Sequence, residues 1–491
     1  MIPGRCGDAI PPATLAPQAT RREPSMECDL VVLGSGPGGY PAAIRAAQLG
    51  ASVIVVEKAE TVGGTCLNVG CIPTKAMVQS AHAYEDAQGH FAQLGVRLGS
   101  IDLDFEQVQS NRRGIVDGVV KGLAGLLKTN GIQVVRGRGT FTGPNTLAVE
   151  GGEDIRFTSA VIATGSRAAA PPIPGIDHPR CIDSTGALEM DAVPRRLAVL
   201  GGGVIGVEFA SIYAQFGSAV TVVEMLPNLI GNEDADAVSA LQRAFRRRGI
   251  GVEVGARATK IEERDGDLAL TYENEAGESK EVVADVVLVA TGRVANVEDI
   301  GLEAAGVTGE RRRIPVDSHM RTNVPNIYAV GDVAGNWQLA HTAFREGEVA
   351  AENALGHDSE IDYRSTPRCV YTAPEIASVG ISEAQAREQH GDHVVTGTMP
   401  YAAIARAAMY GDRTGFVKVI GEARYGELLG MVAVGTQATE LIEAGVVALE
   451  AEATLETVGD SIAAHPTLGE ATKEAALVAL GRPLHVPAKK R

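Results

Sequence analysis

The sequence predicts an α/β protein in which two Rossmann-like dinucleotide-binding units precede a smaller α+β domain. Two glycine-rich turns, beginning at Gly34 and at Gly201, each follow a short apolar strand pattern and open an apolar helical pattern. After each helix a second strand ends on a glutamate, at the same offset from the first glycine. This repeated unit with its acid is much stronger evidence for nucleotide binding than a lone glycine triplet.

The first unit begins with the apolar run Cys28 to Leu33, and its second strand, residues 52–56, ends on Glu57. Glycines in the turn let the backbone approach a pyrophosphate at the helix N-terminus. The acid can accept a hydrogen bond from a ribose hydroxyl. The fingerprint glycines are Gly34, Gly36 and Gly39.

The second unit has strands at residues 197–200 and 219–223, and the latter strand ends on Glu224. Its fingerprint glycines are Gly201, Gly203 and Gly206. Two unrelated glycine turns in α/β layers are the alternative, and the matching acid disfavours it. Each unit has a later strand that ends in Ala-Thr-Gly, at Gly165 and at Gly292. We therefore expect two dinucleotide sites.

Proline, glycine and changes of composition suggest the domain boundaries. Residues 171–175 form a proline-rich linker, and after about Tyr363 the pattern changes to mixed strands and helices. A start at Met26, with the leader disordered or not translated, fits the proline-rich opening. The expected divisions are a leader 1–28, a first nucleotide domain 29–170 and 290–362, a second 171–289, an interface domain 363–482 and a tail 483–491.

Composition narrows the possible partners. The chain has 44 basic and 61 acidic residues, a net charge of −17, which disfavours nucleic acid and anionic membranes. No apolar run is long enough to span a bilayer, and the opening residues do not form a signal peptide. Six cysteines in 491 residues make no secreted disulfide framework. We expect a reducing cytoplasmic setting, or the mitochondrial matrix if the source is eukaryotic, and no metal site.

Cys66 and Cys71 lie five positions apart, within the segment from Gly63 to Lys75. In a regular helix their Cα atoms would be roughly 8.7 Å apart. A disulfide needs about 4.4–6.8 Å. Gly70 and the neighbouring glycines allow the distortion that a disulfide would require. A small, constrained ring suits a disulfide that opens and closes, whereas two buried reduced thiols are the alternative.

Two further segments carry candidate chemistry. The strand 327–330 leads into Asp332, and the helical pattern 338–355 after it could present N–H groups to an anion. Near the C-terminus His465 and Glu470 flank a proline turn and could act as a base and its orienting carboxylate. A solvated histidine is the alternative for His465.

Together these features resemble the flavin-dependent pyridine nucleotide-disulfide oxidoreductases over about residues 29–480. The resemblance is carried by the cysteine segment, both glycine turns, Tyr328-Ala329-Val330-Gly331-Asp332 and His465-Pro466-Thr467, in the family's order. It implies FAD at the first turn and NAD at the second. The residues it assigns to FAD are Gly34, Gly36, Gly39, Glu57, Lys75, Thr164, Gly165, Asp332 and Ala340. Those it assigns to NAD are Gly201, Gly203, Gly206, Glu224 and Gly292.

The resemblance also implies catalytic roles. Cys66 would exchange with the dithiol substrate and Cys71 would be the charge-transfer thiol beside the flavin. The partner subunit of a homodimer would contribute His465, oriented by Glu470, so that the active site is shared across the interface. The resemblance further implies a cis peptide bond before Pro466 and an ion pair between Lys75 and Glu208.

Within the family the resemblance is closest to enzymes that oxidise protein-bound dihydrolipoyl groups with NAD+. The expected partner is a lipoyl-bearing acyltransferase or carrier protein of a 2-oxoacid dehydrogenase or glycine cleavage complex. Glu224 would repel a 2′-phosphate and so favours NAD over NADP. The chain departs from the family pattern at Ala463, Gly469 and Ala373, where histidine, serine and histidine are usual.

Several alternatives share part of this pattern. One is an NAD(P)H-dependent reductase of another disulfide, and another is a quinone reductase of the diaphorase type, which leaves the cysteines unexplained. A mercuric-ion reductase should have a further cysteine pair near the C-terminus, and residues 481–491 have none. A non-catalytic assembly subunit would not need two nucleotide sites.

Overall fold

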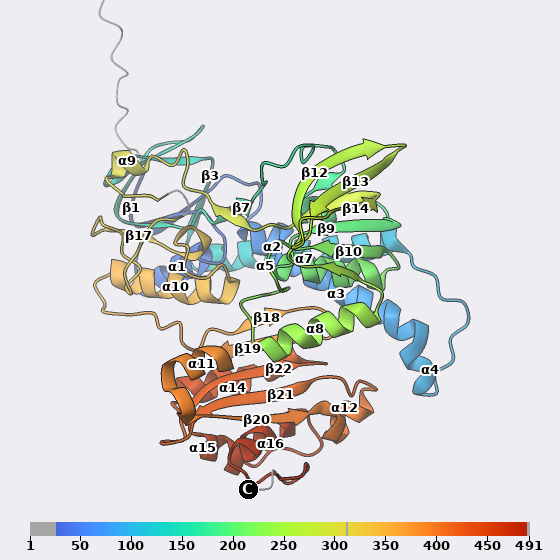
Figure 1. Cartoon of the computed structure of the whole chain (residues 1–491). Helices are drawn as coiled ribbons and strands as arrows, with labels where there is room; N and C mark the ends of the chain where they lie inside the picture. The colour runs from blue at the N-terminus through green and yellow to red at the C-terminus, as the bar shows by residue number, and fades with distance from the viewer. Residues whose placement is uncertain (1–25, 311–312, 489–491) are drawn as a thin grey trace, which may run out of the picture.

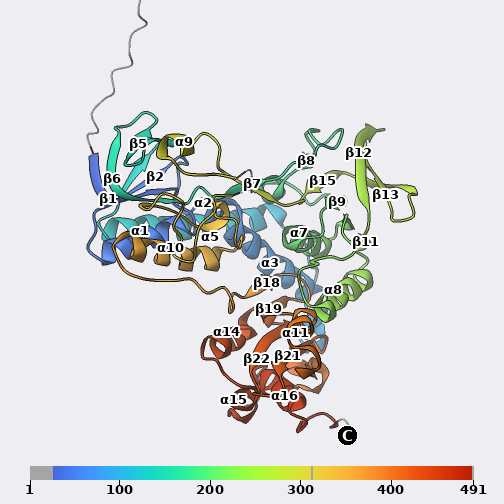
Figure 2. The same ribbon diagram turned by 60° about the vertical axis from the view of Figure 1, so that its left-hand side comes forward.

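The computed structural model describes residues 26–310 and 313–488. Two sheet-based units lie side by side, and a smaller domain from the C-terminal part of the chain lies beneath them (Figure 1). The view turned by 60° shows the same arrangement (Figure 2). Within the described residues no helix is both long and apolar enough to cross a bilayer. The expected leader lies outside the described residues, apart from its last three positions.

Those three positions correct the expected leader boundary. Strand β1 (Met26–Leu33) begins at Met26 and pairs in parallel with β6 (Ile155–Ile162), with Met26 opposite Ile155 and Cys28 opposite Phe157. This pairing satisfies backbone groups that would otherwise need another partner. Met26 to Cys28 therefore belong to the sheet.

The first sheet has the strand order β3-β2-β1-β6-β5-β4, with β17 also paired to β6. The strands around β1 run parallel, and β2 is buried throughout, as expected for a strand covered on both faces. The remaining strands are β2 (Val53–Glu57), β3 (Gln133–Arg136), β4 (Gly139–Gly143), β5 (Thr146–Val149) and β17 (Ile327–Ala329).

Three helices matter most for this sheet: α1 (Gly39–Gln48), α5 (Phe105–Thr129) and α10 (Ala340–Ala354). Helices α1 and α10 lie together below the sheet (Figures 1 and 2). They approach so closely that a Cβ on Gly347 would lie 2.4 Å from the carbonyl oxygen of Gly38. Shorter elements are the π-turn η1 (Asp86–His90), α4 (Phe91–Gln93), α9 (Leu302–Ala305) and the 3₁₀ turn η2 (Gly331–Val333).

The second unit contains a parallel sheet of order β11-β10-β9-β15-β8. Its strands are β8 (Cys181–Ile182), β9 (Arg196–Leu200), β10 (Ala219–Val223), β11 (Gly251–Glu253) and β15 (Val286–Val289). Its helices are α6 (Ser184–Leu188), α7 (Val204–Gln215) and α8 (Ala235–Arg247). An antiparallel sheet of β12 (Arg257–Arg264), β13 (Asp267–Glu273) and β14 (Ser279–Ala284) adjoins it.

A two-stranded antiparallel ribbon joins the two units where the chain leaves the first and returns to it. It consists of β7 (Ser166–Ala168) and β16 (Arg293–Ala295). The strands of the second unit, β8 to β15, thus lie between β7 and β16 along the chain.

The C-terminal domain is an antiparallel sheet of order β18-β19-β22-β21-β20. Its strands are β18 (Arg368–Val370), β19 (Ile376–Gly380), β20 (Val394–Pro400), β21 (Phe416–Glu422) and β22 (Leu428–Val434). Its helices are α11 (Glu383–His390), α12 (Ala405–Met409), α13 (Ala438–Leu441), α14 (Glu443–Glu450), α15 (Leu455–Asp460) and α16 (Glu470–Ala479). The 3₁₀ turns η3 (Gly391–His393) and η4 (Tyr401–Ala403) complete it.

A buried lysine ties this domain to the second unit. The Nζ atom of Lys418 in β21 lies 3.0 Å from Asp234, 2.8 Å from Asp236 and 2.7 Å from Glu383. The side chains of Lys418 and Asp234 are only 3% and 4% exposed. Removing one partner of such a buried pair typically costs about 3–5 kcal/mol. The cluster therefore fixes the start of α8 against the C-terminal domain.

Candidate active site and nucleotide sites

The first glycine turn needs glycine for two separate reasons. Gly34 has φ +104°, and a Cβ there would lie 2.4 Å from the carbonyl oxygen of Ala163. A Cβ on Gly39 would lie 1.9 Å from the carbonyl oxygen of Gly34. No side chain fits at either position, so the helix can begin directly behind the strand, as a phosphate-binding turn requires.

The second turn has the same construction. Gly201 has φ +112°, and its Cβ would lie 2.4 Å from the carbonyl oxygen of Ala290. A Cβ on Gly206 would lie 2.0 Å from the carbonyl oxygen of Gly201. The structure therefore places two geometrically equivalent turns in one chain.

The two acids lie at equivalent places beside these turns. Glu57 accepts hydrogen bonds from the backbone N–H of Ser35 at 2.9 Å and of Ala59 at 2.8 Å. Glu224 accepts from the N–H of Gly202 and, at 2.6 Å, from that of Leu226. Each carboxylate is thus fixed at the carboxyl end of its strand, the edge where ligands bind in such sheets.

Three helices begin at these sites without a capping side chain. Helix α1 starts after Gly38, α7 after Gly203 and α10 after Leu339, and none of these residues caps the helix. Uncapped N–H groups with a positive dipole end are suited to an anionic ligand. The local structure therefore fits the phosphates of two dinucleotides and the anionic edge of a flavin.

The two cysteines lie on either side of a break between two helices. Cys66 is in α2 (Gly64–Val69), and Cys71 begins α3 (Cys71–Glu85). The intervening Gly70 has φ −135° and ψ −114°, and its Cβ would lie 2.8 Å from the carbonyl oxygen of Thr65. A distortion of this kind is what a disulfide between the two positions would require. Both cysteines are free thiols in the structure.

The cysteine segment lies directly over the first turn. A Cβ on Gly64 would be 2.6 Å from the Cα atom of Gly36. The backbone N–H of Gly63 also donates to the carbonyl oxygen and the hydroxyl of Ser35, both at 3.1 Å. The sulfurs and the first dinucleotide site are therefore parts of one assembly.

Lys75 and Glu208 form the expected ion pair. The Lys75 Nζ atom lies 3.0 Å and 2.8 Å from the two carboxylate oxygens, and it lies 4.6 Å from the ring centroid of Tyr371. The N–H of Tyr371 donates to Glu208 at 2.9 Å. The sequence predicts no role for Tyr371, because only packing of the C-terminal domain brings it to α3 and α7.

The surroundings of the two thiols shift their pKa values in opposite directions. Hydrogen bonding to Cys66 and the charge of Lys75 lower the pKa of Cys71, against burial and Glu208. The same hydrogen bond and burial raise the pKa of Cys66. Cys71 is therefore the sulfur whose thiolate the site favours, which suits a charge-transfer thiol.

The Asp332 turn lies between the ends of several strands. Asp332 bonds to the hydroxyl of Ser166 and lies 3.5 Å from Nε of Arg293, which itself donates to Ser166 at 2.6 Å. Ser166 and Arg293 carry no motif of their own. Their position directly after Gly165 and Gly292 was the only signal in the sequence.

The other expected nucleotide residues also lie at strand ends. Thr164 donates its hydroxyl to the carbonyl oxygen of Asn296 at 2.8 Å. Gly165 has φ +66° and Gly292 has φ +125°, and a Cβ on either would meet open space. Ala340 is the first residue of α10. Open space and unusual backbone geometry here are compatible with close approach of a ligand.

His465 and Glu470 form a hydrogen-bonded pair in the C-terminal domain. The Nδ1 atom of His465 lies 2.8 Å from Glu470 Oε1, and the N–H of Thr467 donates to Oε2 at 3.0 Å. These hydrogen bonds lower the pKa of Glu470 despite its burial. The bond before Pro466 is cis, as expected. The His465 side chain is 73% exposed.

In both overall views α16, which begins at Glu470, lies at the far end of the C-terminal domain from α2 (Figures 1 and 2). One chain thus does not bring His465 to its own cysteines. This placement fits a site completed by a second copy.

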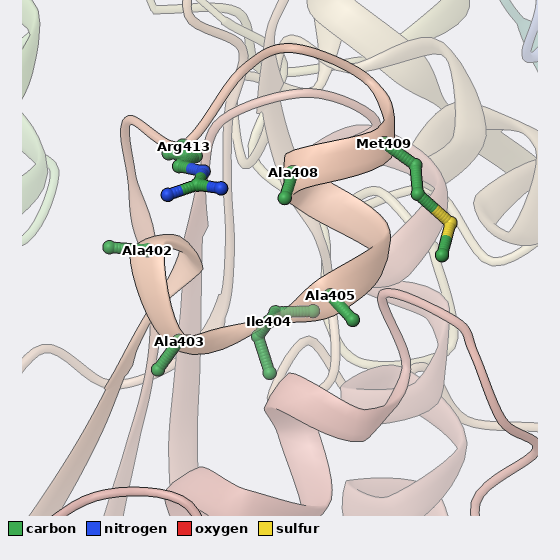
Figure 3. A pocket seen from close by; sticks show the side chains of 7 residues that line it. All are labelled: Ala402, Ala403, Ile404, Ala405, Ala408, Met409 and Arg413. Carbon is green, nitrogen blue, oxygen red and sulfur yellow. The ribbon is translucent and has the colours of Figure 1, made fainter.

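A separate hollow of about 530 Å³ lies on the C-terminal domain (Figure 3). It is formed by Ala402, Ala403, Ile404, Ala405, Ala408, Met409 and Arg413. Its lining has one charged side chain and no cysteine, histidine or carboxylate. The cysteine segment therefore remains the candidate active site, because the lining of this hollow offers no group for thiol or acid–base chemistry.

Known proteins share this architecture. A family model described as pyridine nucleotide-disulphide oxidoreductase matches residues 28–347, and the model of that family's dimerisation domain matches residues 366–476. The dihydrolipoyl dehydrogenase of Geobacillus stearothermophilus is 41% identical over 469 residues, covering 95% of this chain and 99% of the relative. The enzyme of that name from Thermus scotoductus is 42% identical over 465 residues, covering 93% and 98%.

Among solved structures, LpdA from Mycobacterium tuberculosis matches with a TM-score of 0.84 and 29% identity, covering 92% of this chain and 99% of that chain. The HOCl-induced flavoprotein disulfide reductase RclA from Escherichia coli, as a Cu(II) complex, matches with a TM-score of 0.82, the same identity and the same coverage. These matches confirm the family that the motifs suggested. The chain belongs to the pyridine nucleotide-disulphide oxidoreductases, enzymes that use FAD and NAD.

Proposed function

We propose that this chain oxidises protein-bound dihydrolipoyl groups to lipoyl groups with NAD+ as acceptor. The observation that carries the proposal is the Cys66/Cys71 pair, which lies over the first glycine turn and beside the Lys75–Glu208 ion pair. The dihydrolipoyl dehydrogenases that match the chain nearly end to end support the substrate.

The chain's own residues would hold both cofactors. The first turn and the uncapped start of α1 would bind the pyrophosphate of FAD, with Glu57 on the ribose and Asp332 on the ribityl chain. Thr164, Gly165, Lys75 and Ala340 would surround the rest of the flavin. FAD, when bound, supplies the carrier of two electrons between the cysteine pair and NAD+.

The thiol chemistry follows from the separation of the two sulfurs. In the oxidised enzyme a substrate thiolate would attack Cys66 of a Cys66–Cys71 disulfide, forming a mixed disulfide and releasing Cys71 as a thiolate. The second substrate thiol would then displace Cys66, so that lipoyl disulfide leaves and the protein keeps both electrons. Lys75 would stabilise the Cys71 thiolate.

Proton removal from the substrate would fall to His465 of a second copy. Its Nδ1 faces Glu470, which leaves Nε2 available as the base. A homodimer with the active site shared across the interface is therefore part of the proposal, supported by the dimerisation-domain match. The proposed carrier is a lipoyl-bearing acyltransferase or carrier protein of a 2-oxoacid dehydrogenase or glycine cleavage complex.

The second turn would bind NAD through Gly201, Gly203, Gly206 and Gly292. Glu224 supports NAD rather than NADP, because its carboxylate is fixed beside the turn where a 2′-phosphate would lie. A related proposal, reduction of another disulfide by NAD(P)H, uses the same cysteines. RclA, named a disulfide reductase, and the substitutions at Ala463, Gly469 and Ala373 are the observations that favour it.

The test compares reduction of NAD+ and of NADP+ by dihydrolipoamide in the wild-type protein, Cys66→Ser and the control Cys181→Ser. Cys181 is another free cysteine, in β8. We expect NAD+ to be much the better acceptor, activity to fall at least about 1,000-fold in Cys66→Ser, and the control to be unchanged. Dye reduction by NADH should partly survive in Cys66→Ser. Undiminished dihydrolipoamide turnover in Cys66→Ser contradicts the assigned role.

A further inference from the structure

A fully buried carboxyl group in α10 has no role in the chemistry described so far. Glu346 is 0% exposed. Its Oε2 atom accepts the backbone N–H of Gly331 at 2.6 Å, and its Oε1 atom accepts the hydroxyl of Tyr363 at 2.7 Å. Gly331 has φ +72° and immediately precedes Asp332. Glu346 therefore holds the backbone of the turn that carries Asp332.

Tyr363 connects this carboxyl group to two other segments. It lies on the connector between α10 and β18, and its hydroxyl accepts a hydrogen bond from Asn336 Nδ2 at 2.9 Å. The same connector is held to α10 where Asn353 bonds with Ser359, at 2.7 Å and 3.0 Å. The phenol thus lies where the connector, α10 and the loop after Asp332 meet.

The Asp332 turn is held from two sides. Ser166 and Arg293 hold the Asp332 carboxylate, whereas Glu346 holds the N–H of the preceding residue. Two hydrogen bonds link Glu346 to the turn and to Tyr363, and hydrogen bonds fix direction as well as distance.

The burial of the Glu346 carboxyl group carries a desolvation cost. Desolvation raises the pKa of Glu346 to about 7, despite the hydrogen bonds from Tyr363 and Gly331. Within the described residues no lysine, arginine or histidine forms an ion pair with it. A buried ionisable group without a cation is generally worse for stability than an apolar residue of similar size. The two hydrogen bonds that Glu346 accepts are therefore the contacts that define its place in the structure.

We propose that Glu346 and Tyr363 are positioning residues that orient the Gly331–Asp332 turn to receive the ribityl chain of FAD. This inference rests on the proposed function, in which Asp332 contacts that chain. The connector to the C-terminal domain then contributes to FAD binding through a single phenol group.

The test uses the full-length holoprotein and the variant Tyr363→Phe, which removes one oxygen atom and keeps the ring. The control is Tyr425→Phe, because Tyr425 is 77% exposed. FAD release is followed by the rise in flavin fluorescence after dilution. Loss of one hydrogen bond to a buried carboxyl group should speed release about 10-fold, and the control should match the wild type.

Glu346→Gln, with Glu348→Gln as its control, provides a second measurement. Glu348 pairs with Arg345 on the exposed side of the same helix. Glutamine keeps the shape but replaces one carboxylate oxygen with an amide nitrogen, which cannot accept, so one of the two hydrogen bonds is lost in the present geometry. We expect faster release, together with a shift of the visible flavin absorption band. The control should change neither.

The outcomes separate the two proposals. Wild-type protein that binds no FAD contradicts the proposed function. Wild-type protein that binds FAD, while Tyr363→Phe and Glu346→Gln release it at the wild-type rate with an unchanged spectrum, overturns the positioning role. Lower thermal stability of the FAD-free variants, with unaltered FAD release, indicates a merely structural network and equally overturns it.

Discussion

The two glycine turns have the same internal geometry but very different surroundings. In the first turn Gly36 lies against Gly64 of the cysteine segment, and a Cβ on Gly38 would lie 2.7 Å from Val330 Cγ2. In the second turn a Cβ on Gly203 would meet nothing within 4 Å, and the neighbouring Val204 is 40% exposed. One turn is covered by protein and the other is open.

The residue that follows the first glycine of each turn shows how this difference in exposure arises. Ser35 follows the first glycine of the covered turn and donates its hydroxyl to Glu57 while accepting from the N–H of Gly63. Gly202 takes its place in the open turn, where a Cβ would lie 2.5 Å from Leu229 Cδ2. The serine links its turn to the cysteine segment, and the glycine makes room for a buried leucine.

The fingerprint therefore specifies the kind of ligand, whereas the surroundings specify how readily that ligand is exchanged. A turn enclosed by α2, α10 and the end of β17 suits a cofactor that stays bound through many turnovers. An open turn suits one that binds and leaves in each turnover. The same motif can therefore serve a retained FAD and a diffusible NAD.

Replacing the equivalent glycines should have the largest effect, and it tests whether the two turns hold different cofactors. Gly39→Ala and Gly206→Ala each place a Cβ about as close to a carbonyl oxygen, at 1.9 Å and 2.0 Å. We expect Gly39→Ala to be purified without flavin absorbance, and Gly206→Ala to keep its flavin but bind NAD+ roughly 100-fold more weakly.

Flavin absorbance and NAD+ titration measure the two effects. Gly114→Ala is the control, because a Cβ on this α5 residue meets open space. Loss of flavin from both turn variants, or from neither, would contradict the difference between the turns.

An intermediate effect is expected from Lys75→Met. This change removes the ion pair between the cysteine segment, which lies over the first turn, and Glu208 in α7, the helix that follows the second turn. Lys75 lowers the pKa of Cys71, so its removal should raise that pKa and move the pH profile of Cys71 alkylation to higher pH. At neutral pH the alkylation rate should fall about 10-fold.

Alkylation by iodoacetamide, with Cys71 identified by peptide mapping, provides the measurement. Lys121→Met, at an exposed position on α5, is the matched control and should leave the profile unchanged. An unshifted profile in Lys75→Met would show that the ion pair does not act on the thiol.

The smallest effect should come from Ser35→Gly, which gives the covered turn the residue of the open one. Loss of the hydrogen bonds to Glu57 and Gly63 should destabilise the holoprotein by about 1 kcal/mol and speed FAD release about 5-fold. Ser35→Ala separates loss of the hydroxyl from added backbone freedom. FAD release at the wild-type rate in both variants would mean that this link does not help to retain the cofactor.

Local rules were enough to predict the α/β class, both turns with their acids, and the helix break between the cysteines. Gly34, Gly39, Gly201 and Gly206 are dictated by contacts within a strand–turn–helix unit, so a single sequence reveals them. Gly70 allows the break that a disulfide at this spacing would require. The leader boundary was placed slightly late, because the pairing of Met26 with β6 is a long-range contact.

Only the tertiary structure decided which distant residues complete the sites. Tyr371 at the Lys75–Glu208 pair and Arg293 at Asp332 come from other parts of the chain, and no local pattern predicts these contacts. Glu346 has its partner, Tyr363, on another segment for the same reason. The exposure of each turn likewise depends on which segments pack against it. Sequence periodicity records local geometry, whereas these contacts depend on how the sheets and helices come together in space.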